Sequence, residues 1–157
     1  MRMVNQLPLP LLLVELIASN RWAVPGRTYL KSWTQFFNHG GLAIEGDLQI
    51  RLFSIDEMGE KTTKLSCELF PVKVDSDWKN SITKHLKAES VDPEKSVVIA
   101  DLLYRTRFPD TLVVPIVLDY RYSIGSPRVI CYPDDAFEKY WYEVSPRFED
   151  FVRALGL

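Results

Sequence analysis

The chain has 157 residues, a length that fits one compact domain with a core large enough to need no metal ion or disulfide. Apolar residues make up 46% of it and charged residues 25%, which is typical of an ordinary soluble globular protein. Its 19 Lys and Arg against 21 Asp and Glu give a net charge of −2. This balance argues against a nucleic-acid binder, because such proteins neutralise phosphates with a basic surface.

The first expected element is a helix that begins after Pro10, since proline suits the first turn of a helix. One apolar stripe at helical spacing supports it: Leu9, Leu12, Leu13, Leu16 and Ile17. Asn20 can end this helix in a left-handed conformation. A secretion signal is the alternative, but Pro8, Pro10 and Glu15 interrupt the apolar run. The run is also too short to cross a bilayer, so we expect no membrane contact and a cytoplasmic location.

The middle of the chain mixes helical and alternating patterns. We expect a short second helix over residues 29–37 and a half-buried strand over 48–55. The sequence DEMGEK, residues 56–61, then resembles a hairpin turn, with a partner strand over 64–74. Residues 75–89 have the spacing of another helix.

The last third contains four strand-like runs separated by Pro, Gly and Asp: residues 96–104, 111–120, 127–132 and 140–144. A closing helix follows, with Ser145 as its expected N-cap, Pro146 at its first position and Gly156 as its stop. Consecutive strands with short turns favour an antiparallel sheet. We therefore predict one α+β domain over residues 1–157, with an antiparallel sheet flanked by helices from both ends of the chain.

The polar residues at the end of the second of these runs are the first candidates for chemistry. Asp119 and Arg121 leave an apolar strand on the same face, two residues apart. They fit an ion pair that marks a strand end, or a carboxylate held for acid–base work. We favour the ion pair, because no second titratable group is indicated nearby. Asp101 lies inside another apolar run, where an unpaired carboxylate is costly. We expect it to anchor the fold by facing Arg105 or Arg121 or by accepting backbone N–H groups, with a binding role as the alternative.

Metal, cofactor and nucleophile signals are weak. Cys67 and Cys131 stand far apart, and so do His39 and His85, with no metal-ligand spacing around them. We expect reduced, buried thiols, no metal and no cofactor. The sequence also lacks a Gly-x-Ser-x-Gly elbow and a phosphate-binding Gly-rich loop.

A dense aromatic cluster near residue 140 offers a different kind of site. In a strand, alternation places Trp141 on one face and Tyr140 and Tyr142 on the other, so these side chains cannot all be buried. Tyrosine is over-used at protein interfaces, and the acidic residues Asp134 and Asp135 lie close by. We name Asp134, Asp135, Tyr140 and Tyr142 as candidate partner-binding residues. The alternatives are packing under the last helix and a solvated acidic turn.

Five segments in order carry a resemblance to a known family. They are LPLPLLLVELIASNRWAVPG, VVIADLL, VPIVLDYR, PRVICY and WYEVSPRFEDFVRALGL. In this order the chain resembles the SUKH superfamily, the Smi/Knr cell-wall-assembly-regulator group. The likeness covers residues 7–26 and 97–157 and is poor over 27–95. The motif residues are Trp22, Asp101, Pro115, Asp119, Tyr120, Arg121, Trp141, Pro146 and Phe148. The family's Gly-Asp-Leu-Gly pattern reads Ala100-Asp101-Leu102-Leu103 here.

The resemblance implies an α+β fold and a protein-binding role. Bacterial members of the superfamily are commonly immunity proteins that bind and neutralise polymorphic or contact-dependent toxins, and fungal members act as regulatory scaffolds. We therefore expect a non-enzymatic module whose partner is a cognate toxin domain. The alternatives are a regulatory scaffold without a toxin partner and an enzyme that uses Asp101, Asp119 and Arg121.

Overall fold

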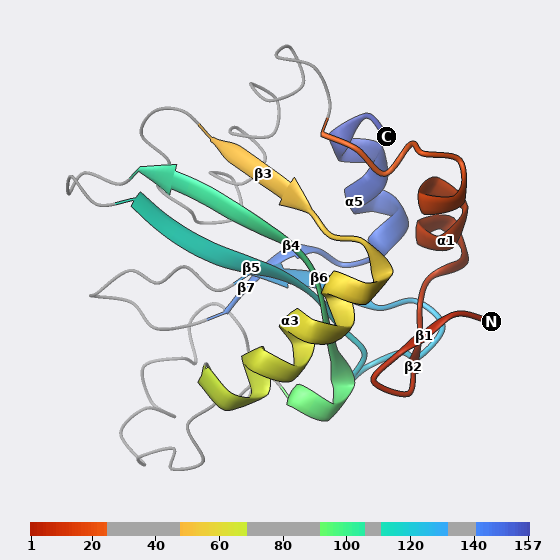
Figure 1. Cartoon of the computed structure of the whole chain (residues 1–157). Helices are drawn as coiled ribbons and strands as arrows, with labels where there is room; N and C mark the ends of the chain where they lie inside the picture. The colour runs from red at the N-terminus through yellow and green to blue at the C-terminus, as the bar shows by residue number, and fades with distance from the viewer. Residues whose placement is uncertain (25–47, 69–91, 106–110, 132–140) are drawn as a thin grey trace.

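The computed structural model describes residues 1–24, 48–68, 92–105, 111–131 and 141–157 (Figure 1). The fold is α+β, as expected, with a two-stranded hairpin and a five-stranded antiparallel sheet in the order β3-β4-β5-β6-β7. Its elements are β1 (Met3–Val4), β2 (Leu7–Pro8), α1 (Leu11–Ala18), β3 (Gln49–Leu52), α3 (Ile55–Glu68), the 3-10 turn η2 (Pro93–Lys95), β4 (Ser96–Arg105), β5 (Thr111–Asp119), β6 (Arg128–Cys131), β7 (Tyr142–Ser145) and α5 (Phe148–Leu155).

The sheet confirms the strand-like runs of the last third of the chain. Strands that follow one another in sequence pair with one another, as short turns require. β4 and β5 form the longest pair and run through the core, where Val97–Ala100 and Ile116–Leu118 are buried. The expected strand over 140–144 is displaced, since β7 begins at Tyr142 and buried Trp141 precedes it.

The segment after β3 is a helix, so the predicted turn at 56–61 and the predicted strand over 64–68 are wrong. A capping box starts α3: the Ser54 amide donates to Glu57 Oε2 (2.9 Å), and the Glu57 amide donates to Ser54 Oγ (3.3 Å). The apolar Met58 is fully buried one turn further on. Residues 69–74, the rest of that predicted strand, lie outside the described part of the chain.

Helix α3 also protects the edge of β4. The β3–β4 pairing covers Ala100–Leu103 of β4, and the β4–β5 pairing shifts its register between Val98 and Ala100. There the Val98 amide donates to Thr62 Oγ1 (2.9 Å), and the Thr62 hydroxyl donates to the Met58 carbonyl (2.6 Å). A side chain of α3 thus occupies the ladder position that β3 leaves, which satisfies a buried donor at a sheet edge.

The terminal helices lie next to each other at one end of the sheet, and α3 crosses in front of β4 (Figure 1). α1 follows Pro10, and Asn20 takes the left-handed conformation expected after it (φ 56°). The rings of Trp22 and Phe148, which begins α5, pack with centroids 6.1 Å apart. Both ends of the chain therefore contribute described residues to one hydrophobic core.

The start of α5 corrects one prediction. Arg147 is its N-cap, whereas Ser145 ends β7 and donates from Oγ to the Arg147 carbonyl (3.0 Å), so Ser145 and Pro146 do not open the helix. Gly156 ends it in the left-handed region (φ 73°), as predicted. None of the described helices is both long and apolar enough to traverse a bilayer. The helices expected over 29–37 and 75–89 lie outside the described residues, as do His39 and His85.

Candidate functional site

The candidate site is built around Asp119, the last residue of β5. Its side chain has no exposed surface. Arg121 donates to it from Nε (3.0 Å to Oδ1), from Nη2 (3.0 Å to Oδ2) and from its backbone amide (3.1 Å to Oδ1). Arg128 stands opposite Asp119 in the β5–β6 register and donates from Nε to Oδ2 (2.7 Å). The ion pair expected between Asp119 and Arg121 is present, and the antiparallel register adds a second guanidinium.

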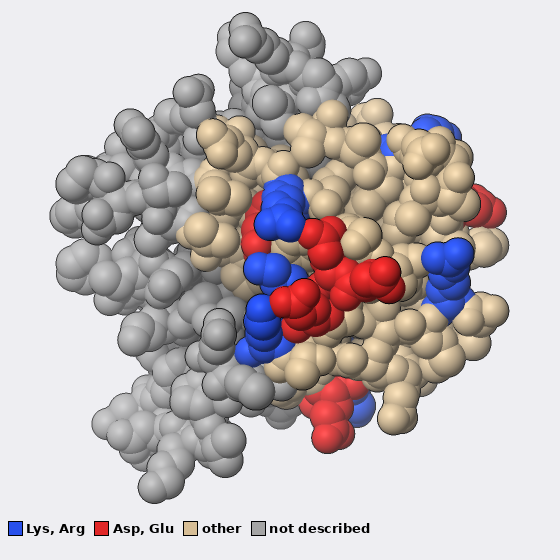
Figure 2. Space-filling view, in the orientation of Figure 1, with Lys and Arg blue, Asp and Glu red and all other residues tan. Residues whose placement is uncertain are grey.

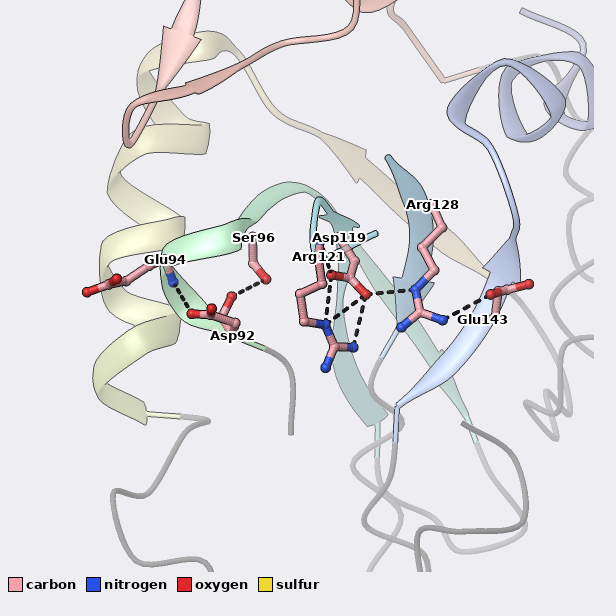
Figure 3. A network of polar contacts seen from close by, with 7 residues as sticks. All are labelled: Asp92, Glu94, Ser96, Asp119, Arg121, Arg128 and Glu143. Carbon is pink, nitrogen blue, oxygen red and sulfur yellow. Dashed lines mark hydrogen bonds and ion pairs between the residues drawn. The ribbon is translucent and has the colours of Figure 1, made fainter. Parts of the chain in front are cut away.

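The network continues onto β7. Arg128 Nη1 donates to Glu143 Oε2 (3.1 Å), so one guanidinium joins a carboxylate of β5 to a carboxylate of β7 (Figure 3). Asp119 and Glu143 carry two negative charges, and Arg121 and Arg128 carry two positive charges. The sum is zero, which limits the cost of holding four charged groups in a half-buried place.

The environment of Asp119 keeps it ionised. Burial alone raises the pKa of this carboxyl, but hydrogen bonds from the Arg121 side chain, the Arg121 amide and the Arg128 side chain outweigh burial and lower its pKa below the ordinary value. Each oxygen accepts more than one donor. A carboxylate with a lowered pKa is a weak base and therefore a poor proton acceptor. General acid–base catalysis works best with a group whose pKa lies near the working pH.

The loop between β5 and β6 projects an aromatic ring from this network. The Arg128 guanidinium lies 4.6 Å from the centroid of the Tyr122 ring, and the Arg121 guanidinium lies 5.8 Å from it. Tyr122 and Ile124 are nevertheless each 66% exposed. Sequence reasoning missed these two residues. The signal was available as an aromatic and an aliphatic residue inside a polar turn, YRYSIGSP, that follows a core strand.

Two surface depressions meet at Tyr122. The smaller, of ≈ 270 Å³, is lined by Tyr122, Ser126, Arg128, Glu143 and Pro146. The larger has a volume of ≈ 340 Å³. Its lining combines apolar and basic side chains: Leu7, Lys95, Tyr120, Arg121, Tyr122, Ser123 and Ile124. Tyr122 therefore lines both depressions, and the neighbouring Ile124 lines the larger one.

Asp101 belongs to a different part of the sheet. It stands opposite Pro115, four positions along β5 from Asp119, or roughly 13 Å at the usual rise of a strand. Its described ion-pair partner is Lys61 of α3 at 3.7 Å, whereas the expected Arg121 bonds to Asp119; the side chain of Arg105, the other expected partner, lies outside the described part of the structure. Burial raises the pKa of Asp101 despite this lysine and Arg51. The structure therefore joins Asp119 to Arg121. Asp101, on β4, lies in a separate group of charges with Lys61 of α3 and Arg51 of β3.

Charges around α3 are mixed. Lys64 bonds to Glu60 within the helix (2.6 Å), and Arg51 of β3 bonds to Glu57. Figure 2 shows the result on the face in view, where acidic and basic side chains lie beside one another. An interleaved surface of this kind does not give the single-sign field that draws a protein to nucleic acid.

Three of the nine residues named for the resemblance, Trp22, Tyr120 and Phe148, join segments that are distant in sequence. Tyr120 donates from its hydroxyl to the Pro8 carbonyl (2.7 Å), and the Trp22 indole donates to the Phe53 carbonyl (3.2 Å). The Phe148 amide donates to the Pro127 carbonyl (3.1 Å). Pro146 lines the smaller depression. These bonds connect the N-terminal segment to the residue after β5 and to the residue after β3, and the start of α5 to the residue before β6.

The candidates near residue 140 have no described side chains. Asp134, Asp135 and Tyr140 lie outside the described residues, and only the backbone of Tyr142 is described, in β7. Cys131 is a buried free thiol, as expected, whereas the Cys67 side chain is outside the described part. Within the described ranges no three His, Cys, Asp or Glu side chains gather in a way that could hold a metal ion.

Comparison of the chain with protein-family models, with curated proteins and with solved structures finds no match.

Proposed function

We propose that this chain is a non-enzymatic protein-binding module, an immunity protein that binds and neutralises a bacterial toxin domain. The observation that carries the binding role is the β5–β6 loop, which holds Tyr122 and Ile124 in solvent above a buried ion-pair network. Exposed aromatic side chains on a rigid base are typical anchors of protein interfaces. The resemblance to SUKH proteins supports the toxin as the partner.

The ion pairs beneath the loop support this role. Side-chain ordering normally opposes association, and a contact that is already fixed reduces this cost. Both arginines next to Tyr122 are held by Asp119, whose side chain is fully buried. The two arginines that contact the ring are therefore already held in place by Asp119, which reduces the ordering that a partner has to supply on this side of the contact.

The chemistry of Asp119 favours binding over acid–base catalysis. Its oxygens are occupied by two guanidiniums, and its pKa is lowered. Asp101 lies four strand positions away with Lys61 as its partner. An enzyme built on Asp101, Asp119 and Arg121 needs these groups to converge on one substrate, and their separate networks weigh against it.

The partner is sought in the product of the adjacent gene. The purified chain is mixed with that protein, and the Kd is measured by calorimetry; in parallel, toxicity is measured in cells that express both. We expect tight binding, protection of the cells, and loss of affinity of about 30-fold or more in Tyr122→Ala and Ile124→Ala, as for interface hot spots.

A matched control is Val113→Ala, which truncates another exposed apolar side chain (52%) six positions from Asp119 along β5. We expect it to change the Kd by less than about threefold. If products of adjacent genes do not bind, the immunity role is contradicted. If binding occurs without protection, the regulatory scaffold becomes the better description.

A further inference from the structure

Arg128 holds a hydrogen-bond donor that the described residues leave without an acceptor. Its Nε is bonded to Asp119 and its Nη1 to Glu143, whereas Nη2 is shielded from solvent and has no partner among them. A buried donor without an acceptor costs free energy, and native structures rarely keep one without a reason. The guanidinium thus has one position prepared for a further oxygen.

The smaller depression is an open space beside this guanidinium. Arg128 lines it together with Tyr122, Ser126, Glu143 and Pro146, and its ≈ 270 Å³ is several times the ~30 Å³ share of one water molecule. A peptide group therefore fits. The Tyr122 ring lies against the Arg128 guanidinium but is 66% exposed, so rotation of this ring displaces little packing.

Charge decides which oxygen suits the position. The two carboxylates and two guanidiniums already sum to zero, so a further carboxylate or phosphate leaves the cluster with a net negative charge in a partly buried place. Lys95 lines the larger depression rather than this one. A carbonyl oxygen accepts the same hydrogen bond without adding a charge.

We propose that turning of the Tyr122 ring opens Arg128 Nη2 to this depression, where a main-chain carbonyl of the bound partner accepts its hydrogen bond and the ring packs on the same peptide group. This proposal rests on the proposed function for the identity of the donor chain, a protein. The chemistry of the position itself can be tested without any partner.

The test is an NMR titration of the full chain, labelled at arginine and tyrosine, with N-methylacetamide as the probe of a peptide carbonyl and acetate as the probe of a carboxylate. We expect N-methylacetamide to shift the Arg128 guanidinium and Tyr122 ring signals. Acetate at the same concentration should not change the chemical shifts of Arg128 and Tyr122. The signals of the exposed Arg2 and Arg21 should not shift with either probe.

The variant Glu143→Gln sharpens the test, because it removes one negative charge and gives the cluster a net charge of +1. Acetate should then shift the Arg128 signals more than N-methylacetamide does. The matched control is Glu15→Gln, an exposed carboxylate on α1 that is absent from the cluster, and it keeps the wild-type preference.

Three results overturn the proposal: acetate acting as strongly as N-methylacetamide on the wild type, no shift with either probe, or an unchanged preference in Glu143→Gln. A positive titration combined with failure to bind any toxin leaves the carbonyl site intact and contradicts only the proposed function.

Discussion

At the scale of the residue, Asp119 and Asp101 show two outcomes for a carboxylate in a sheet. Asp119 is fully buried but receives donors from two arginines, and its pKa is lowered. Asp101 has one lysine at 3.7 Å, and burial raises its pKa. The same residue type thus stabilises the fold in one place and opposes it when ionised in the other.

We predict that Asp119→Asn costs about 3–5 kcal/mol of unfolding free energy at pH 7, because it leaves two guanidiniums in a buried network without their counter-charge. The folded-state pKa of Asp119 is below its ordinary value of 3.8, so its stabilisation is present above that pH and is lost as the pH falls through the folded pKa. Urea unfolding of wild type and variant between pH 2 and pH 7 measures this. The gap between them should begin to narrow near pH 4 and should close as the pH falls through the lower, folded-state pKa of Asp119.

Asp101→Asn is the control for this experiment. Because the folded pKa of Asp101 is raised, its ionisation disfavours the fold as the pH rises above 3.8, and removing the charge should change stability at pH 7 by less than about 1 kcal/mol. Equal losses in the two variants, or a gap for Asp119→Asn that is constant with pH, would contradict the assigned roles.

At the scale of the element, the sequence predicts strands better than it predicts α3. β4, β5 and β6 are runs rich in β-branched residues between Pro, Gly and Asp, so their pattern is local and readable. In α3 the sequence DEMGEK, residues 56–61, resembles a hairpin turn. The Ser54-x-x-Glu57 capping box and the spacing of Ile55, Met58 and buried Thr62 indicate a helix.

The site was predictable only where its contacts are local. Asp119 and Arg121 are two positions apart on one face, so their pairing follows from alternation. Arg128 and Glu143 join them through the registers of β5–β6 and β6–β7, which strand propensity does not define. Thr62 meets the Val98 amide at a bulge, and no local pattern reveals a bulge partner 36 positions away.

The two interpretations of residues 55–68 make opposite predictions for Gly59→Ala. In the helix, a Cβ at Gly59 meets no atom within 4 Å, and alanine should raise the unfolding free energy by about 0.5–1 kcal/mol because it restricts the unfolded chain. In a hairpin turn with positive φ, the same change would destabilise the protein. Denaturant midpoints distinguish the two cases.

Ser54→Ala should lower the unfolding free energy by about 1 kcal/mol, because it removes the side chain that caps α3.

At the scale of the whole molecule, hydrogen bonds attach the N-terminal segment to elements that lie far from it in the sequence. The Tyr120–Pro8 hydrogen bond spans 112 positions and the Trp22–Phe53 bond spans 31. Both anchor the first 24 residues to the end of the sheet that carries the β5–β6 loop and α5. Tyr120 therefore has two roles: it holds the N-terminal hairpin through Pro8, and it lines the larger depression beside the β5–β6 loop.

Tyr120→Phe is expected to loosen the β1–β2 hairpin without unfolding the sheet. Burial raises the pKa of Tyr120, so its hydroxyl stays protonated as a donor throughout the physiological range. Its loss leaves the Pro8 carbonyl without that donor and costs about 1 kcal/mol. Hydrogen exchange should become faster at the Leu9 amide, which bonds to the Arg2 carbonyl, while the β5 and β6 amides keep their protection. Tyr122→Phe, which alters a largely exposed residue, should leave the Leu9 amide unchanged. An equal loss of protection in β5 would instead mean that the hairpin and the sheet unfold as one unit.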